Sequence, residues 1–584
     1  MTKLDTLGWL TVPARRHMSG TEKTTALSKM QYTSPLHDMG YIDLISSTVF
    51  MGFAWVIWGY FRKRRVSSVL KNLPGPRSTS FLYGHFGDFF GRHGTEFNKE
   101  VALKYGAVCK MNGMLGRTVL YVSDPKALHT IILKEEHIYQ ESEGFIAALK
   151  LIFGPSLTST LGEVHRKQRK MLNPVFSVAH MRNMIPLFYG VSFKLRTAIT
   201  QRVAQGPQEL DVLGWTGRTA LELIGQGGFG YSFDSLTEDS QDAFGEALKD
   251  LSPNLQKFDH SRYFISLFAA LGPAWLRRRL VELVPSKDLQ RVLSIIDIMT
   301  QKSIEVYQDK KAALARGDRA VVQQIGEGKD LMSILIKANS AASKGNRLSE
   351  EELIAQISSF VFAGMDTTSN SISRILHILA QRPEVQDKLR EEILAAGAGE
   401  NISYEDLNKL SLLDAVCRET LRVFPPVTGL TRVATKDSVL PLSEPIMGLD
   451  GTLITEIPIP EGTELIVGTM GSNLRPAVWG EDSLEWKPER WLLPLPTKVT
   501  DASIPGVYSN LMTFLGGKRA CIGFKFSEME MKVVLSVLLS TFRFEESDKP
   551  VIWNVGAVWY PTVGSESNVS ELRLKVSLLD ARKA

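Results

Sequence analysis

Residues 514–523 read Phe-Leu-Gly-Gly-Lys-Arg-Ala-Cys-Ile-Gly, and a helical pattern follows directly from Phe524 to Leu539. Cys521 therefore lies at the start of a predicted helix, where free backbone N–H groups and the helix dipole favour a thiolate and lower the pKa of a thiol. A sulfur in such a place is a metal ligand or a nucleophile, although most cysteines in glycine-rich turns are simply buried. The glycines permit a tight turn and close approach of a flat, bulky group, and Arg519 adds a cation beside it.

This stretch resembles the haem-binding loop of the cytochrome P-450 monooxygenases, F-x-x-G-x-R-x-C-x-G, at every fixed position. The resemblance implies that Cys521 is the axial thiolate ligand of the iron of haem b and that Arg519 contacts a haem propionate. Among haem proteins, thiolate ligation is the kind that favours O–O cleavage. The implied fold is that of a microsomal-type P-450, mainly α-helical with small β-sheets in a single large catalytic domain.

The longest predicted helix runs from about Glu350 to Gln381. Ser349 and Glu352 have capping-box spacing at its start, and Pro383 ends it. Apolar residues lie around much of its circumference, so we expect it to be buried. At its middle, Gly364 opens a groove for a small molecule, and a threonine hydroxyl there can bond to the backbone carbonyl three or four residues back, locally widening the helix.

Residues 363–368 of this helix, Ala-Gly-Met-Asp-Thr-Thr, are similar to the oxygen-activation motif of the P-450 family. The resemblance implies that Thr367 hydrogen-bonds dioxygen and that Asp366 helps to deliver protons. Taken alone, the same residues would indicate a helix bend with an exposed acid.

Glu419 and Arg422 are i and i+3 on a second predicted helix, Leu412 to Val423. Such a pair usually lies on the surface and contributes little to stability. The pair is similar to the E-x-x-R motif of the family, whose third member would here be Arg490 in the stretch Trp-Lys-Pro-Glu-Arg-Trp at 486–491. The resemblance implies that the three residues form a buried network that shapes the haem loop.

Two further segments supply expected propionate contacts. Arg432, thirteen residues after Glu419, corresponds by position to a residue of the family that reaches a propionate. The family's W-x-x-x-R motif is replaced by His165 and Arg169, which are i and i+4 on one helix face and can still each donate to a propionate. Because the indole is absent here, the role carries over more directly to Arg169 than to His165.

The N-terminal region predicts a membrane anchor. The eighteen residues 44–61 contain no charged side chain, and the cations at 62–65 close the run. About 20 residues are needed to cross a ~30 Å hydrocarbon core, and the basic cluster places the body of the protein in the cytoplasm. The alternatives are a signal peptide, whose cations would precede the apolar run, and a buried core helix.

We therefore expect four segments: a disordered extension (1–40), the transmembrane anchor (41–61), a basic and proline-rich hinge (62–80) and the haem-thiolate domain (81–584). Asp5 and Glu22 argue against the remaining possibility for the N-terminus, a mitochondrial presequence. Single-pass anchoring in the endoplasmic reticulum membrane follows from this organisation.

Composition excludes several classes of protein. The chain has 584 residues with 68 basic and 63 acidic side chains, a balance that gives no support for nucleic-acid binding. Its three cysteines cannot form a disulfide framework. Residues 225–230 match the dinucleotide pattern G-x-G-x-x-G, but a helix end precedes them instead of a strand, so we reject a Rossmann site. With no flavin or nicotinamide motif of its own, the protein must receive electrons from a partner.

Strand-like runs cluster at 439–467 and 571–579. By analogy with the family, four segments line the substrate pocket, and they are mostly apolar: Phe360–Ala363, Val427–Leu430, Val558–Tyr560 and Glu141–Leu157. A lipophilic substrate is therefore expected.

The sequence thus predicts a membrane-anchored monooxygenase that uses O2 and an NADPH-dependent cytochrome reductase. The sequence as a whole resembles fungal members of the family, many of which oxidise terpenoids or other specialised metabolites. Two alternatives stay open. One is a haem-thiolate isomerase or dehydratase of the same fold, against which the intact Asp366-Thr367 pair argues; the other is a non-catalytic haem sensor or membrane interaction protein.

Overall fold

The computed structural model describes residues 70–579, apart from 79, 235, 237–242, 259–261 and 318–328. The predicted extension at 1–40, the predicted anchor at 41–61 and the first part of the predicted hinge lie outside the described residues. Within the part of the chain that is described, no helix combines the length and the apolar character needed to cross a bilayer.

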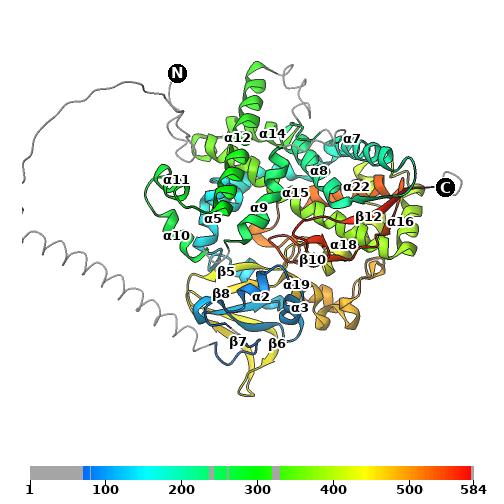
Figure 1. Cartoon of the computed structure of the whole chain (residues 1–584). Helices are drawn as coiled ribbons and strands as arrows, with labels where there is room; N and C mark the ends of the chain where they lie inside the picture. The colour runs from blue at the N-terminus through cyan, green and yellow to red at the C-terminus, as the bar shows by residue number, and fades with distance from the viewer. Residues whose placement is uncertain are drawn as a thin grey trace, which may run out of the picture.

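The long helix predicted from the sequence is present as α15, Glu350–Gln381, with Ser349 and Glu352 forming the predicted capping box. The helix ends at Arg382, directly before Pro383, as the pre-proline restriction requires. It packs against α8, α12 and α22, and Figure 1 shows it passing through the middle of the helical part of the molecule. Of its 32 residues, 22 are buried, so it forms the centre around which the other helices are arranged.

The helices that precede α15 in the chain are α2 (Phe86–Phe90), α3 (Thr95–Leu103), α4 (Pro125–His129), α5 (Glu143–Phe153), α6 (Gly162–Leu172), α7 (Val178–Val203), α8 (Val212–Ile224), α9 (Ala243–Gln256), α10 (Arg262–Ala269), α11 (Ala274–Glu282), α12 (Lys287–Arg316) and α14 (Leu331–Ala341). Those that follow it are α16 (Pro383–Ala395), α17 (Tyr404–Leu407), α18 (Ser411–Val423), α19 (Thr469–Leu474), α20 (Pro476–Trp479), α21 (Thr497–Asp501) and α22 (Phe524–Leu539). The mainly helical fold class is thereby confirmed.

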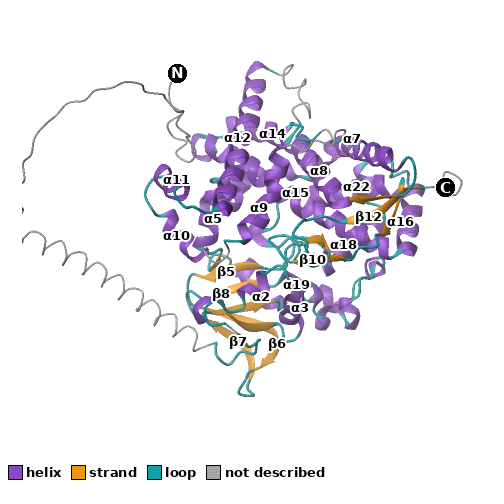
Figure 2. Ribbon diagram, in the orientation of Figure 1, coloured by secondary structure: helices purple, strands orange, loops and turns teal. Residues whose placement is uncertain are grey.

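Small sheets complete the fold, and Figure 2 shows most of their strands gathered on one side of the helices. The largest sheet has the order β1-β2-β8-β5-β3 and consists of β1 (Val108–Asn112), β2 (Thr118–Val122), β8 (Glu464–Val467), β5 (Leu430–Ala434) and β3 (Tyr139–Gln140). In it β2 and β8 pair in parallel, whereas its other pairs are antiparallel. The other sheets are β4-β12-β9 (Gln208–Asp211, Arg573–Leu578, Phe542–Glu546), β6-β7 (Ser438–Met447, Leu453–Ile459) and β10-β11 (Val551–Asn554, Tyr560–Val563).

The described part of the predicted hinge packs on the body of the domain. Leu70 and Leu73 are buried in the main core, and the Lys110 N–H of β1 donates to Pro74 O at 2.7 Å. Gly75 is required there, because a Cβ would lie 1.8 Å from Lys110 O. This segment fixes the direction in which the chain enters the domain.

The glycine-rich stretch at 225–230 is not a nucleotide site. Helix α8 runs directly into it, and Gly225–Phe229 forms a single π-helical turn that ends at Gly230 with φ of +59°. A dinucleotide fingerprint would need a strand before the glycines and a helix after them. The rejection made from the sequence is therefore confirmed.

Candidate active site

The cysteine loop is shaped by two glycines that no other residue could replace. A Cβ on Gly516 would lie 1.5 Å from the Pro505 carbonyl oxygen. Gly517 has φ of +63°, and a Cβ there would lie 2.4 Å from Ile132 O. After a 3₁₀ turn at Gly517–Arg519, the chain reaches Cys521, three residues before α22 begins. The predicted tight turn and the following helix are both present.

Cys521 presents its side chain to an accessible space, although Ala520 next to it is buried. Its backbone N–H donates to Phe514 O at 2.9 Å, which closes the loop. Desolvation by the surrounding protein raises the pKa of the Cys521 thiol, and the Gly523 N–H and the Arg169 guanidinium oppose that shift. The lowered pKa expected from the sequence is therefore wrong for the free thiol, because loss of water outweighs the favourable charges. Coordination to a metal deprotonates a thiol outright.

Arg169 and His165 lie on α6 beside the cysteine loop. An Arg169 Nη1–H donates to Ala520 O at 2.6 Å, so this guanidinium contacts the residue that precedes the cysteine. His165 is buried, and burial, together with the Arg519 and Arg169 charges, lowers its pKa to about 4. At neutral pH His165 is consequently an uncharged donor and Arg169 is the cation of the pair.

Arg519 and Arg432 meet at a carboxylate that sequence reasoning did not identify as their partner. Arg519 Nε lies 2.7 Å from Glu141 Oε1, and Arg432 Nη2 lies 3.3 Å from the same oxygen. Glu141 follows β3 and is 378 residues from Arg519. No pattern in the sequence indicates this pairing. From the sequence, Glu141 is expected only as the first residue of a segment that lines the substrate pocket.

The middle of α15 is the other half of the site. Ala363 is exposed although the residues at 353–361 are buried, so accessible space reaches the centre of this helix. The Thr367 hydroxyl donates to Ala363 O at 2.8 Å, as predicted, and the helix stays α-helical through this turn instead of widening. Burial raises the pKa of Asp366 to about 6, against the opposing effects of Lys249 and Ser252. A carboxyl that titrates near neutral pH is suited to proton transfer.

Glu419 and Arg422, which lie on α18, form a fully buried pair. Arg422 Nη2 lies 2.7 Å from Glu419 Oε1, and both side chains are wholly inaccessible. Arg490 joins them, with its Nε 3.5 Å from the same carboxylate oxygen. The Trp491 indole N–H also donates to Glu419, at 2.9 Å. The structure thus brings the three charged residues together in the interior, where a pair at i, i+3 rarely lies.

Two contacts involve the segments expected to line the substrate pocket. The ring centroids of Phe153 on α5 and Phe362 on α15 are 5.2 Å apart. The backbone N–H of Trp559 donates to the carbonyl of Pro426, the residue directly before the segment 427–430, at 3.0 Å. Phe360, Val558 and Trp559 are buried. The segments also carry polar side chains, among them Glu141, Lys150 and Thr428. The hydroxyls of Thr158 and Ser359, which adjoin two of the segments, are 2.9 Å apart.

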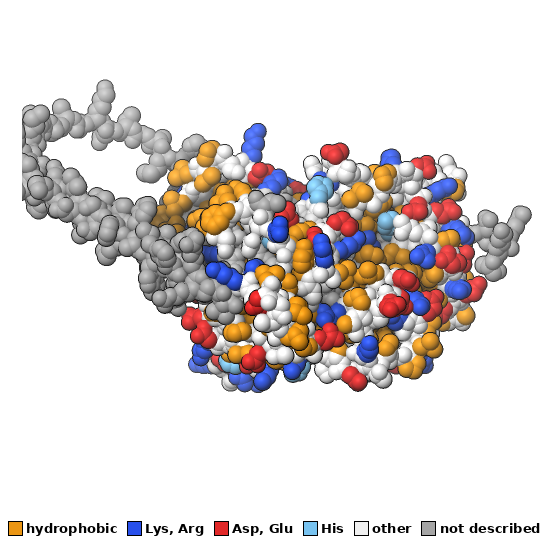
Figure 3. Space-filling view, turned by 90° about the horizontal axis from the view of Figure 1, so that it is seen from below, with side chains coloured by type: hydrophobic (Ala, Val, Ile, Leu, Met, Phe, Trp, Pro, Cys, Tyr) orange, Lys and Arg blue, Asp and Glu red, His pale blue; other side chains and the backbone are white. Residues whose placement is uncertain are grey.

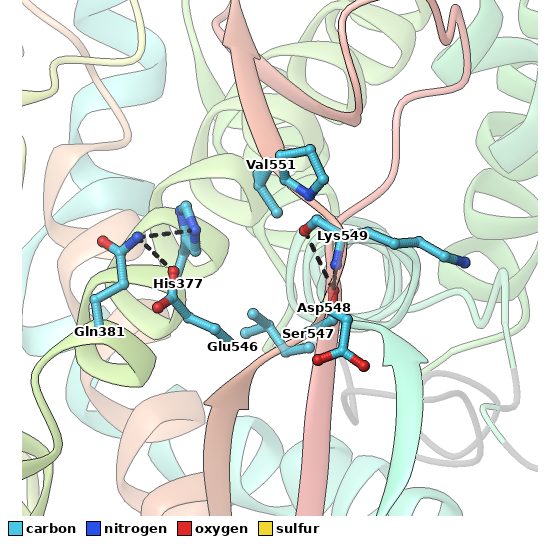
Figure 4. Close-up of a pocket in the computed structure, with 9 residues that line it drawn as sticks. His377, Gln381, Glu546, Ser547, Asp548, Lys549 and Val551 are labelled. Carbon is cyan, nitrogen blue, oxygen red and sulfur yellow. Dashed lines mark hydrogen bonds between the residues drawn. The ribbon is translucent and has the colours of Figure 1, made fainter.

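A pocket of about 400 Å³ lies elsewhere, at the C-terminal end of α15 (Figure 4). It is about 15 Å along the helix axis from Thr367, as ten residues at helical rise require. Its lining is largely polar: His377, Gln381, Glu546, Ser547, Asp548, Lys549, Pro550, Val551 and Leu574. This pocket is separate from the cysteine loop and offers no apolar substrate site.

His377, which lines this pocket, should make the stability of the fold depend on pH. His377 accepts from the Trp553 indole N–H at 3.1 Å, and burial together with Arg374 lowers its pKa from 6.5 to about 4. The unfolded chain therefore takes up the proton first, so stability is full above pH 6.5 and is lost as the pH falls toward 4. We expect a loss of up to about 3 kcal/mol in unfolding free energy from this residue.

Denaturant unfolding of wild type and His377→Gln at neutral and acidic pH measures this effect. The glutamine oxygen can still accept from Trp553, so the variant should lose less stability on acidification. His93→Gln, at an exposed histidine, is the control. Equal acid sensitivity of wild type and His377→Gln would contradict the assignment.

Comparison with known proteins shows where this architecture belongs. The sequence model of the family "Cytochrome P450" matches residues 74–555. Cytochrome P450 monooxygenase 212 of Postia placenta is 58% identical over 531 residues, which cover 90% of this chain and 97% of that protein. Monooxygenase 219 of the same fungus is 54% identical, over 92% and 98% of the two chains. A ganoderic acid synthetase of Ganoderma lucidum is 48% identical, over 90% and 97%.

The resemblance drawn from the cysteine loop is confirmed by these matches. With a family model that spans most of the sequence and relatives of this identity over nearly their full length, the chain belongs to the cytochrome P450 monooxygenases, whose cofactor is a thiolate-ligated haem iron.

Proposed function

We propose that this chain is a membrane-associated monooxygenase that inserts one oxygen atom from O2 into a lipophilic substrate. The observation that carries the proposal is the proximity of two segments, the Cys521 loop leading into α22 and the turn of α15 that bears Thr367. The hydroxyls of Thr368 and Ser527 are 3.1 Å apart and join α15 to α22 beside both segments. A thiolate ligand and a proton-handling turn are thereby assigned to one site.

The residues around Cys521 fit a haem. Its accessible sulfur is a soft donor of the kind that suits iron. The loop that carries it is held in a tight turn by Gly516 and Gly517. We assign Arg169, Arg432 and Arg519 to the two propionates, with His165 as a neutral donor and the Glu419, Arg422 and Arg490 network as the support of the loop. When bound, the haem supplies the redox chemistry that activates dioxygen.

We assign proton handling to Asp366 and Thr367. The Thr367 hydroxyl is bonded only to its own helix, at Ala363 O, among the described residues, so it can turn to donate to dioxygen. Asp366 carries a proton for part of the time near pH 6. Together they can pass protons from the α9 side of α15, where Lys249 and Ser252 lie, to the accessible space at Ala363.

Replacing Asp366 with asparagine tests this assignment. An amide cannot carry the proton, so product formation should fall by about 10²-fold or more. The dependence of turnover on pH across about 6 should disappear with the carboxyl. Turnover measured against pH checks both effects, with Glu351→Gln, in the first turn of the same helix, as the control. An unchanged pH profile in Asp366→Asn would contradict the role.

The expected substrate is apolar and of terpenoid type. The aromatic side chains of Phe153, Phe362 and Trp559 in the expected pocket segments favour an apolar molecule. The name of the Ganoderma lucidum relative, a ganoderic acid synthetase, favours a terpenoid among lipophilic candidates. We propose that the protein serves the specialised metabolism of a fungus.

Membrane association is supported by an exposed apolar surface on α10 and α11. Phe264, Leu267 and Trp275 are each about two-thirds exposed, at 66%, 67% and 66%. Figure 3 shows hydrophobic side chains gathered at that end of the molecule. Exposed apolar side chains grouped on short helices are typical of segments that lie at a membrane surface. Together with the predicted anchor at 41–61, this surface supports our proposal that the protein attaches to the endoplasmic reticulum membrane with its domain in the cytoplasm. Flotation of the full chain with lipid vesicles measures this attachment.

Reconstitution with an NADPH-dependent cytochrome reductase tests the whole proposal. Given a panel of triterpenoids, NADPH and isotopically labelled dioxygen, the enzyme should release a product that carries one labelled oxygen atom. Product formed without NADPH would instead indicate an isomerase or dehydratase. Binding of carbon monoxide with no product from any substrate would favour a haem sensor.

A further inference from the structure

The carboxylate of Glu141 holds two of the arginines assigned to the haem. Glu141 lies between β3 and the N-terminus of α5 and is 8% exposed. One oxygen, Oε1, lies 2.7 Å from Arg519 Nε and 3.3 Å from Arg432 Nη2. A single buried oxygen therefore connects guanidinium groups from β5 and from the cysteine loop.

The two arginines depend on this carboxylate to different degrees. Arg519 also donates to the carbonyl of Thr160 at 3.0 Å, and more weakly to those of Leu157 and Thr158. Among the described residues, the polar partners of Arg432 are Glu141 and its own neighbour, Thr431 O. Arg432 is 4% exposed, so without Glu141 its charge would be buried nearly unpaired, which is costly.

The net charge of the cluster formed by Glu141 and the three arginines is equal and opposite to that of the two haem propionates. Arg169, Arg432 and Arg519 supply three positive charges and Glu141 one negative charge, while His165 is neutral at pH 7. Lys518, which faces the same region, is paired with Glu136 at 2.7 Å. The cluster thus presents a net charge of two positive, the complement of the two carboxylates of a haem.

We propose that Glu141 is a positioning residue for the haem, one that orients Arg432 and Arg519 and sets the charge facing the propionates at two positive. The proposal rests on the haem site of the proposed function. A merely structural carboxylate would affect stability but not the electron affinity of the iron. Glu141, in contrast, lowers that affinity through its charge, because a buried negative charge disfavours the added electron.

The haem midpoint potential of the holoprotein tests this role. Glu141→Gln keeps the shape and one acceptor oxygen but removes the charge, so the potential should shift to a more positive value. Glu141→Gln combined with Arg432→Gln restores the net charge of two positive, and its potential should return toward that of wild type. Glu143→Gln, an exposed carboxylate two residues away, should leave the potential unchanged.

The possible results distinguish a failure of the proposed function from a failure of the role assigned to Glu141. A wild-type protein without the spectrum of thiolate-ligated haem would remove the proposed function itself. If wild type has that spectrum but Glu141→Gln has the potential of Glu143→Gln, the inference alone is wrong. Should Glu141→Gln fail to bind haem, the double variant is expected to regain it, and failure of both, with Glu143→Gln intact, would overturn the charge-balance argument.

Discussion

Replacing Arg422 with leucine is expected to lower the unfolding free energy by about 3–5 kcal/mol, because it leaves the buried carboxylate of Glu419 without its main counter-ion. The guanidinium donates to both oxygens of Glu419, at 2.7 and 2.8 Å. It also donates to the carbonyls of Asn473, Ser483 and Glu485, so one side chain connects α18 to α19 and to the segment at 483–485. A loss of this size is a large part of the ~5–15 kcal/mol that stabilises a domain, so little holoprotein should accumulate.

Denaturant unfolding and the yield of haem-loaded protein measure the effect. Arg166→Leu is the matched control, since Arg166 pairs with Glu163 at the same i, i+3 spacing but with 72% and 84% of the two side chains exposed. An exposed pair contributes about 0–1 kcal/mol, so this variant should resemble wild type. Equal stabilities of Arg422→Leu and Arg166→Leu would show that the buried network does not support the fold.

Replacing Cys521 with serine should reduce product formation to background while leaving the fold nearly unchanged. A hydroxyl cannot replace thiolate as the ligand whose electron donation favours O–O cleavage. The side chain is exposed to an accessible space, so the exchange of sulfur for oxygen costs little packing. Product formation with the reductase, together with the thermal midpoint, measures both effects.

Cys417→Ser provides the matched control for this substitution. Cys417 is fully buried on α18, and burial raises its pKa to about 12, so it is neither a ligand nor a nucleophile. This variant should lose stability but keep turnover per haem. Wild-type turnover by Cys521→Ser would mean that another residue ligates the iron.

The elements that local sequence determines were predicted closely. Ser349 and Glu352 cap α15, and Pro383 ends it, so both ends of a 32-residue helix are set by neighbours in the chain. The glycines of the cysteine loop likewise indicate a turn that only they can adopt. The predicted start of α18 differed from the observed one by a single residue, Ser411 in place of Leu412.

The properties that depend on tertiary packing could not be predicted. Glu141 contacts Arg519, which is 378 residues away in the sequence. Neither residue lies in a local pattern that would indicate this ion pair. The pKa values of His165, Asp366 and Cys521 are shifted first by burial, which a linear sequence does not specify. For Cys521 this reversed the direction expected from its place near a helix start.

The absorbance spectrum of the reduced, carbon-monoxide-bound protein tests the central claim most directly. We expect a red-shifted Soret band in wild type that is absent from Cys521→Ser and retained in Cys417→Ser. A wild-type protein without haem, or with an unshifted band that the Cys521 substitution leaves unaffected, would contradict the assignment of Cys521 as the ligand and the mechanism built on it.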